Sequence, residues 1–115
     1  MDTYSGSGPA IWLAGDPADL EDKLHYGAAG AVTNTGVLND MVQKYGQLTE
    51  VVQRYLDITD LPVVIEVDGG SSAELLEVSS VFTLMSDQVM IKLPCTTYAL
   101  PVFAELKRQG VQTMC

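Results

Sequence analysis

The sequence is short of positive charge. Six lysines and arginines stand against fifteen aspartates and glutamates, which gives a net charge of −9. Nucleic acids and anionic membranes bind proteins through basic patches, so this balance argues against both as partners. No apolar run approaches the roughly 20 residues that a membrane-spanning helix needs. We therefore expect a protein that binds neither nucleic acid nor membrane.

Residues that bind metals or form disulfides are also scarce. The chain has two cysteines, Cys95 and Cys115, and one histidine, His25. Two cysteines are too few for a disulfide scaffold and fit a reducing compartment. His25 falls in a helical pattern far in sequence from both, so the ligand count is too low for a metal site. We expect no metal, and we expect His25 to lie on a helix surface.

The first residues lack the features of a targeting signal. Residues 1–9 are polar and rich in glycine and serine, without the basic start and apolar segment of a signal peptide. We expect a flexible tail over residues 1–9, a single domain over residues 10–115 and a cytoplasmic location.

Short apolar runs alternate with helical patterns along the domain. Strands are predicted at 11–14, 30–34, 63–67 and about 89–93, and a fifth strand begins at 111. Helices are predicted from Asp16–Pro17 to Gly27, over 37–45 and 48–56, after the Ser71–Glu74 capping box, and from Thr96–Thr97 to about Arg108. This α/β order of four βα units and the start of a fifth strand predicts a parallel sheet. An open doubly wound sheet and a (β/α)8 barrel both fit it.

Polar residues stand at equivalent levels near the ends of the first four strands. Lys92 interrupts the apolar run 89–94, where a poorly solvated lysine favours the neutral amine that attacks ketones. Alternatively, Lys92 is an edge-strand lysine that blunts pairing with other chains. Asp16, Asn34 and Glu66 occupy matching positions after the other strands, although each also has a purely structural interpretation as a cap, a turn or an edge residue. In a barrel the four side chains would converge on a site at the carboxyl ends of the strands.

Four segments resemble the N-terminal half of the transaldolases, in the small subfamily that includes the fructose-6-phosphate aldolases. Residues 16–21 resemble the family's Asp-Thr-Gly-Asp-Phe-Glu start, and residues 31–35 resemble its Thr-Thr-Asn-Pro motif. Residues 65–67 resemble the third-strand glutamate segment, and residues 91–96 resemble the Lys-Ile-Pro-x-Thr segment of the Schiff-base lysine. The resemblance implies about half of a (β/α)8 barrel.

The resemblance also implies a mechanism in carbohydrate metabolism, including the pentose phosphate pathway. Lys92 would form a Schiff base with a ketose phosphate or dihydroxyacetone, without a cofactor, and the protonated imine would allow the adjacent carbon–carbon bond to break. Asp16 would take the proton from the neighbouring hydroxyl, and Glu66 would move protons through a water. The substrate-binding residues would be Asn34, Thr33 and Thr96.

The chain departs from the family in two respects. Thr35 replaces a proline, which is expected to loosen the turn after Asn34. The chain also has four βα units and the start of a fifth strand, where the family's barrel has eight strands. Half a barrel has two open edges and an uncovered inner face, so we expect a homo-oligomer or a complementing second half-barrel as partner. The alternative function is a non-catalytic assembly module or a truncated transaldolase-like fragment.

Overall fold

A computed structural model describes residues 11–115, so the tail predicted over residues 1–9 lies outside the described residues. The core of the fold is one parallel five-stranded sheet, whose strands follow each other in chain order. The strands are β1 (Trp12–Leu13), β2 (Gly30–Val32), β3 (Val63–Glu66), β4 (Val89–Lys92) and β5 (Thr113–Met114).

Helices connect each strand to the next. They are α1 (Pro17–Leu20), the 3-10 helix η1 (Lys23–Tyr26), α2 (Thr35–Tyr45), α3 (Leu48–Ile58), α4 (Ser72–Thr83), the 3-10 helix η2 (Thr97–Ala99) and α5 (Leu100–Arg108). Side-chain caps begin three of them. Asp16 Oδ1 accepts from the Ala18 N–H, the Asn34 amide oxygen accepts from the Val37 N–H, and the Ser71 hydroxyl accepts from the Glu74 N–H. None of the helices within residues 11–115 has the length and apolarity to cross a bilayer.

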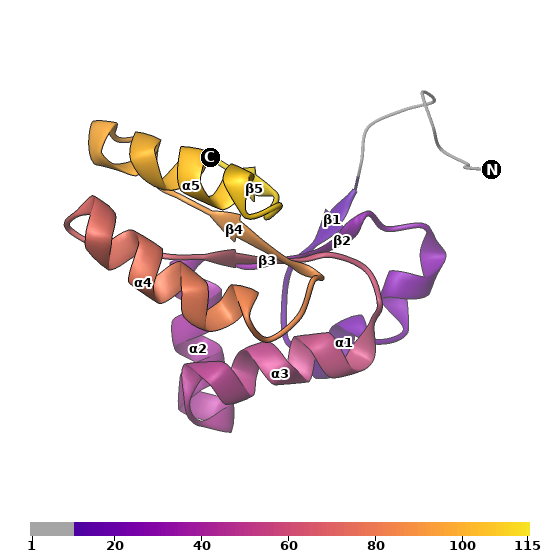
Figure 1. Cartoon of the computed structure of the whole chain (residues 1–115). Coiled ribbons are helices and arrows are strands. Elements are labelled where there is room, and N and C mark those ends of the chain that lie inside the picture. Colours follow the sequence, from indigo (N-terminus) through magenta and orange to yellow (C-terminus); the bar gives the residue numbers. More distant parts are fainter. Residues whose placement is uncertain (1–10) are drawn as a thin grey trace.

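The strand order selects between the two predicted architectures. A doubly wound sheet places its later strands on both sides of the first, whereas a barrel adds each strand beside the previous one. The observed order β1-β2-β3-β4-β5 is that of part of a βα barrel. Figure 1 shows α2, α3 and α4 along one side of the strands and α5 beside β4 and β5. The predicted α/β fold of four βα units and a fifth parallel strand is confirmed.

Alternate strand residues face the helices. Val63, Ile65, Ile91 and Leu93 are almost fully buried and share one apolar core with the helices, including Tyr55 of α3. The β-branched residues among them suit a buried, pleated strand. The intervening residues of the same strands point to the other face of the sheet, because strand side chains alternate. Glu66 and Lys92 belong to that second set.

The first predicted helix is divided in two. Leu20 and Leu24 are buried as their spacing predicted, but α1 ends at Leu20 and the chain resumes as η1. Asp19 of α1 and Asp22 of the turn that follows stand three apart, and like charges at this spacing oppose a continuous α-helix. Gly27 then ends η1 in the left-handed conformation with a φ of 89°.

Cys95 and Cys115 form a disulfide that the expectation of a reducing compartment did not include. The bond joins the segment after β4 to the residue after β5, with 5.7 Å between the Cα atoms. A signal for it was present, because both cysteines follow neighbouring parallel strands at the same end of the sheet. The cytoplasmic location therefore stays a prediction that this bond does not support.

Candidate active site

Glu66 and Lys92 form the centre of the site. They are register partners on β3 and β4, and Lys92 Nζ lies 3.6 Å from Glu66 Oε2. The Lys92 side chain is 31% exposed and the Glu66 side chain 25% exposed, so the amine is more open to solvent than the apolar run predicted. Both side chains stand at the carboxyl ends of their strands, the end where barrel enzymes place their chemistry.

Thr35 holds the other oxygen of Glu66. Its backbone N–H donates to Glu66 Oε1 over 2.7 Å and its hydroxyl lies 2.8 Å from the same atom. The hydroxyl is also 3.1 Å from Oδ2 of Asp68. A proline at this position could donate neither bond. The expectation that Thr35 loosens the turn is therefore wrong, since Thr35 ties the start of α2 to the end of β3.

These contacts act against each other on the Glu66 carboxyl. Burial raises its pKa, whereas the two hydrogen bonds from Thr35 and the charge of Lys92 lower it, and the net result is a lowered pKa. Glu66 is consequently an anion near neutral pH. One of its oxygens is fixed by Thr35, while the other faces the amine.

The predicted substrate-binding residues have different surroundings. Asn34 caps α2 through its amide oxygen, and its NH₂ group has no hydrogen bond within residues 11–115. Thr33 is 1% exposed, and its hydroxyl donates to the Val64 carbonyl over 2.7 Å, which ties β2 to β3. Thr96 is exposed and precedes η2. Asn34 and Thr96 can reach a ligand at this end of the sheet, whereas the buried Thr33 hydroxyl is bonded to the backbone of β3.

Asp16 is bound within a separate network. Its carboxylate lies 2.5 Å from Lys44 Nζ and accepts from the Tyr45 hydroxyl over 2.6 Å, both at the end of α2. It also caps α1 by accepting from the Ala18 N–H. Burial raises the pKa of Asp16, but the bonds from Lys44, Tyr45 and Ala18 outweigh it and lower the pKa to about 2. Within residues 11–115 the carboxylate beside Lys92 is that of Glu66, and Asp16 is not within ion-pair distance of it.

Sequence reasoning missed Thr35, Lys44 and Tyr45. Thr35 was visible as a departure from the Thr-Thr-Asn-Pro motif, and a hydroxyl residue there should have suggested a new hydrogen bond. Lys44 and Tyr45 stand 28 and 29 residues from Asp16, so no local pattern links them to it. The roles of Asp16, Asn34, Glu66 and Lys92 in catalysis stay predictions.

The geometry limits the chemistry of the site. A primary amine next to an anionic carboxylate at an open strand end can add to a carbonyl, and the carboxylate can accept and return protons. A cavity of about 230 Å³ borders Thr35, Glu66 and Asp68, with apolar Leu38 and Phe82 among its lining residues. A larger groove of about 720 Å³ lies along α5, away from this chemistry.

The chain is similar in sequence to known proteins over most of its length. No protein-family model matches the chain. Over 86 residues, 75% of the chain, it is 24% identical to a probable transaldolase of Thermoplasma volcanium, of which the match covers 39%. Over 99 residues, 85% of the chain, it is 25% identical to probable transaldolases of the serotype V and serotype III strains of Streptococcus agalactiae, with 46% of each covered. The chain thus spans less than half the length of the curated relatives it matches, and it is a transaldolase-like segment with the fold of part of a βα barrel.

Proposed function

We propose that the chain carries the Schiff-base part of a transaldolase or aldolase site for ketose phosphates. The observation that supports this most is the Lys92–Glu66 pair, 3.6 Å apart on neighbouring parallel strands. The similarity to probable transaldolases over most of the chain supports the same reaction class.

The proposed reaction begins when the neutral amine of Lys92 attacks the ketone carbon. The carbinolamine loses water to give a protonated imine, and Glu66 relays the protons that this step requires. Loss of the proton from the hydroxyl beside the scissile bond then breaks the carbon–carbon bond. The aldehyde leaves, and the electron pair remains on the lysine-bound fragment as an enamine.

Asp16 takes the hydroxyl proton in this proposal, although its hydrogen bonds to Lys44 and Tyr45 oppose this role. A carboxylate whose pKa is lowered to about 2 is a weak base. Its bonds to Lys44 and Tyr45 must therefore open before it can act. Asn34 orients substrate hydroxyls through its NH₂ group, which its capping bond leaves available.

A non-catalytic assembly module is the second candidate. It is favoured by the engagement of Asp16 with Lys44 and Tyr45, and by the span of less than half of the relatives. In this case the Lys92–Glu66 pair is a cross-strand ion pair of modest stabilising effect.

Turnover separates the two candidates. The chain is incubated with fructose 6-phosphate, alone and together with the part of the Streptococcus agalactiae protein outside the matched segment, and release of glyceraldehyde 3-phosphate is followed. The proposal expects product with the second segment present, a rate about a hundredfold lower for Glu66→Gln, and background for Lys92→Met. Equal rates for wild type and Lys92→Met would contradict it. Release of no product in either condition would favour the assembly module.

A further inference from the structure

Asp68 reaches the same hydroxyl group that holds Glu66. The two carboxylates flank Val67, which is 3% exposed and belongs to the core. The Val67 N–H donates to the Lys92 carbonyl over 3.1 Å, so the chain is still extended beside β4 at this point. Because side chains alternate along an extended chain, Glu66 and Asp68 point to the side opposite Val67. Both of them reach Thr35 at the start of α2.

The Thr35 hydroxyl has two acceptors and only one proton. Its oxygen lies 2.8 Å from Glu66 Oε1 and 3.1 Å from Asp68 Oδ2, and both distances allow a hydrogen bond. A hydroxyl donates one hydrogen bond at a time, so the carboxylate without the proton meets a lone pair of the same oxygen. The Thr35 N–H donates to Glu66 Oε1 over 2.7 Å in either case. The hydroxyl thus has two orientations, and the shorter distance favours the one toward Glu66.

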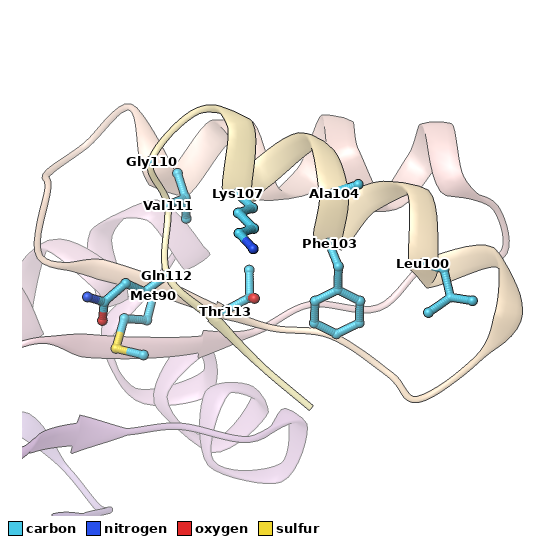
Figure 2. A pocket seen from close by; sticks show the side chains of 9 residues that line it. All are labelled: Met90, Leu100, Phe103, Ala104, Lys107, Gly110, Val111, Gln112 and Thr113. Carbon is cyan, nitrogen blue, oxygen red and sulfur yellow. The ribbon is translucent and has the colours of Figure 1, made fainter.

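The charges around this hydroxyl are mostly negative. Glu66 and Asp68 are the two ionisable side chains that line the cavity of about 230 Å³ beside it. Lys92 of β4 faces Glu66 at 3.6 Å, and Glu74 of α4 packs beside the glycine that follows Asp68. The basic Lys107 belongs to the groove along α5 in Figure 2, whose lining residues include none of these acids. Within residues 11–115 Asp68 forms no ion pair, so the hydroxyl is its one side-chain partner there.

We propose that Asp68 is a positioning residue for Glu66, because it competes with Glu66 for the single proton of the Thr35 hydroxyl. When the hydroxyl points to Asp68, Glu66 keeps only the N–H bond and holds a proton more strongly. When the hydroxyl points to Glu66, the anion gains a second hydrogen bond and a proton leaves it more easily. An exposed acid thereby acts on a half-buried acid through one rotating group.

Schiff-base formation needs both states of Glu66 in turn, and in this respect the inference rests on the proposed function. The Lys92 ammonium first gives a proton to Glu66 Oε2, and the neutral amine attacks the ketone carbon. A second proton then passes from the nitrogen to the former carbonyl oxygen. The proton on Glu66 joins the resulting hydroxyl, which leaves as water, so the protonated imine forms and Glu66 returns to its anion. Rotation of the Thr35 hydroxyl toward Asp68 favours the first transfer, and rotation back favours the last.

A double-mutant cycle on the Glu66 titration measures the competition without any substrate. Carbon-13 NMR follows the side-chain carboxyl of Glu66 in wild type, Asp68→Ala, Thr35→Val and the double variant. Removal of Asp68 leaves the hydroxyl to Glu66, so Asp68→Ala should lower the pKa of Glu66 by at least about 0.5. In the Thr35→Val background only the through-space effect of the Asp68 charge remains, and the decrease should be less than about half as large.

Two further variants separate this competition from a general change of charge. Thr35→Ser keeps a hydroxyl and should keep the larger decrease on removal of Asp68. Asp40→Ala removes an exposed acid of α2 that does not line the cavity, and it should leave the pKa of Glu66 within about 0.2 of wild type. Equal decreases with and without the Thr35 hydroxyl would overturn the proposal, since Asp68 would then act only through its charge.

The pH profile of trapping on Lys92 connects the competition to the chemistry. The rate of reductive trapping of dihydroxyacetone by cyanoborohydride is measured across the pH range of the titration. The acid side of the profile should move to lower pH in Asp68→Ala, by the same amount as the Glu66 titration. A profile that stays in place while the titration moves would overturn the role of Asp68 in proton transfer. Absence of an adduct in every variant would contradict the Schiff-base function instead, and the NMR cycle would still decide whether Asp68 and Glu66 compete for the hydroxyl.

Discussion

Thr35 holds the Glu66 carboxylate in place and lowers its pKa. A residue that departs from the motif supplies two hydrogen bonds to one oxygen of Glu66, while Lys92 faces the other. The acid that would relay protons is therefore held in place from the start of α2, the element that follows Asn34. The motif led us to expect that Thr35 loosens the turn after Asn34, because a motif gives the residue type at a position and not the hydrogen bonds that the residue forms.

Substitution of Thr35 should raise the pKa of Glu66. Thr35→Val removes the hydroxyl donor and keeps the N–H, and Thr35→Pro removes both while suiting the first position of a helix. Since both bonds lower the pKa, it should rise in Thr35→Val and rise further in Thr35→Pro. Carbon-13 NMR titration of the Glu66 side-chain carboxyl measures this. An unchanged Glu66 titration in Thr35→Pro would show that the bonds do not exist in solution.

The Asp16 network should make stability depend on pH below 4. The folded-state pKa is about 2, below the ordinary value of 3.8, so the stabilisation is fully present above pH 4 and is lost as pH falls toward 2. Asp16→Asn keeps the capping oxygen and removes the charge. We expect it to lose about 1 kcal/mol at pH 7 and to converge with wild type near pH 2. Urea unfolding across this range is the measurement. Asp19→Asn, at an exposed position of the same helix, is the control, and parallel curves for wild type and Asp16→Asn would argue against the network.

Gly30 of β2 lies in close contact with Trp12 of β1 and with Pro62, the residue before β3. A Cβ on Gly30 would lie 2.2 Å from the Pro62 carbonyl oxygen and 2.7 Å from the Trp12 ring. Only glycine lets β1, β2 and the entry to β3 approach in this way. The contact depends on residues far apart in sequence, so the sequence offered no reason to single out this glycine.

Gly30→Ala should therefore lower the free energy of unfolding by about 1–3 kcal/mol. Gly70→Ala is the matched control, because a Cβ on Gly70 meets nothing within 4 Å and its φ is not in the left-handed region. It should stay within about 0.5 kcal/mol of wild type. Thermal and urea unfolding of both variants give the comparison, and equal stability of the two would place the strands further apart than described here.

The Cys95–Cys115 disulfide should stabilise the β5 element. It closes a segment of 20 residues that contains η2 and α5, and cross-links of this length add about 2–3 kcal/mol by restricting the unfolded chain. Reductant should lower the urea midpoint of the wild type accordingly. The double variant Cys95→Ser/Cys115→Ser should show the lower midpoint and no response to reductant. Titration of two free thiols in the untreated folded protein would contradict the bond.

At the scale of the whole molecule, periodicity and the resemblance predicted the α/β fold and placed Glu66 and Lys92 at equivalent levels near the ends of their strands. Strand alternation assigns a side chain to one face of its own strand, and the register of β3 and β4 in the structure then pairs Glu66 with Lys92. The position of Asp16 was not predictable in the same way. Its side chain is set by where the last residues of α2 lie, which brings Lys44 and Tyr45 to it from almost 30 residues away. Local sequence patterns predict helices and strands. The partners of a side chain depend instead on how those helices and strands pack.

Reductive trapping shows directly whether Lys92 forms a Schiff base. The chain is incubated with dihydroxyacetone or fructose 6-phosphate and borohydride, with and without the complementing segment, and the digest is mapped by mass spectrometry. We expect a reduced adduct on Lys92 alone among the lysines, and none in Lys92→Met. An adduct that persists in Lys92→Met, or no adduct on Lys92 in either condition, would contradict it.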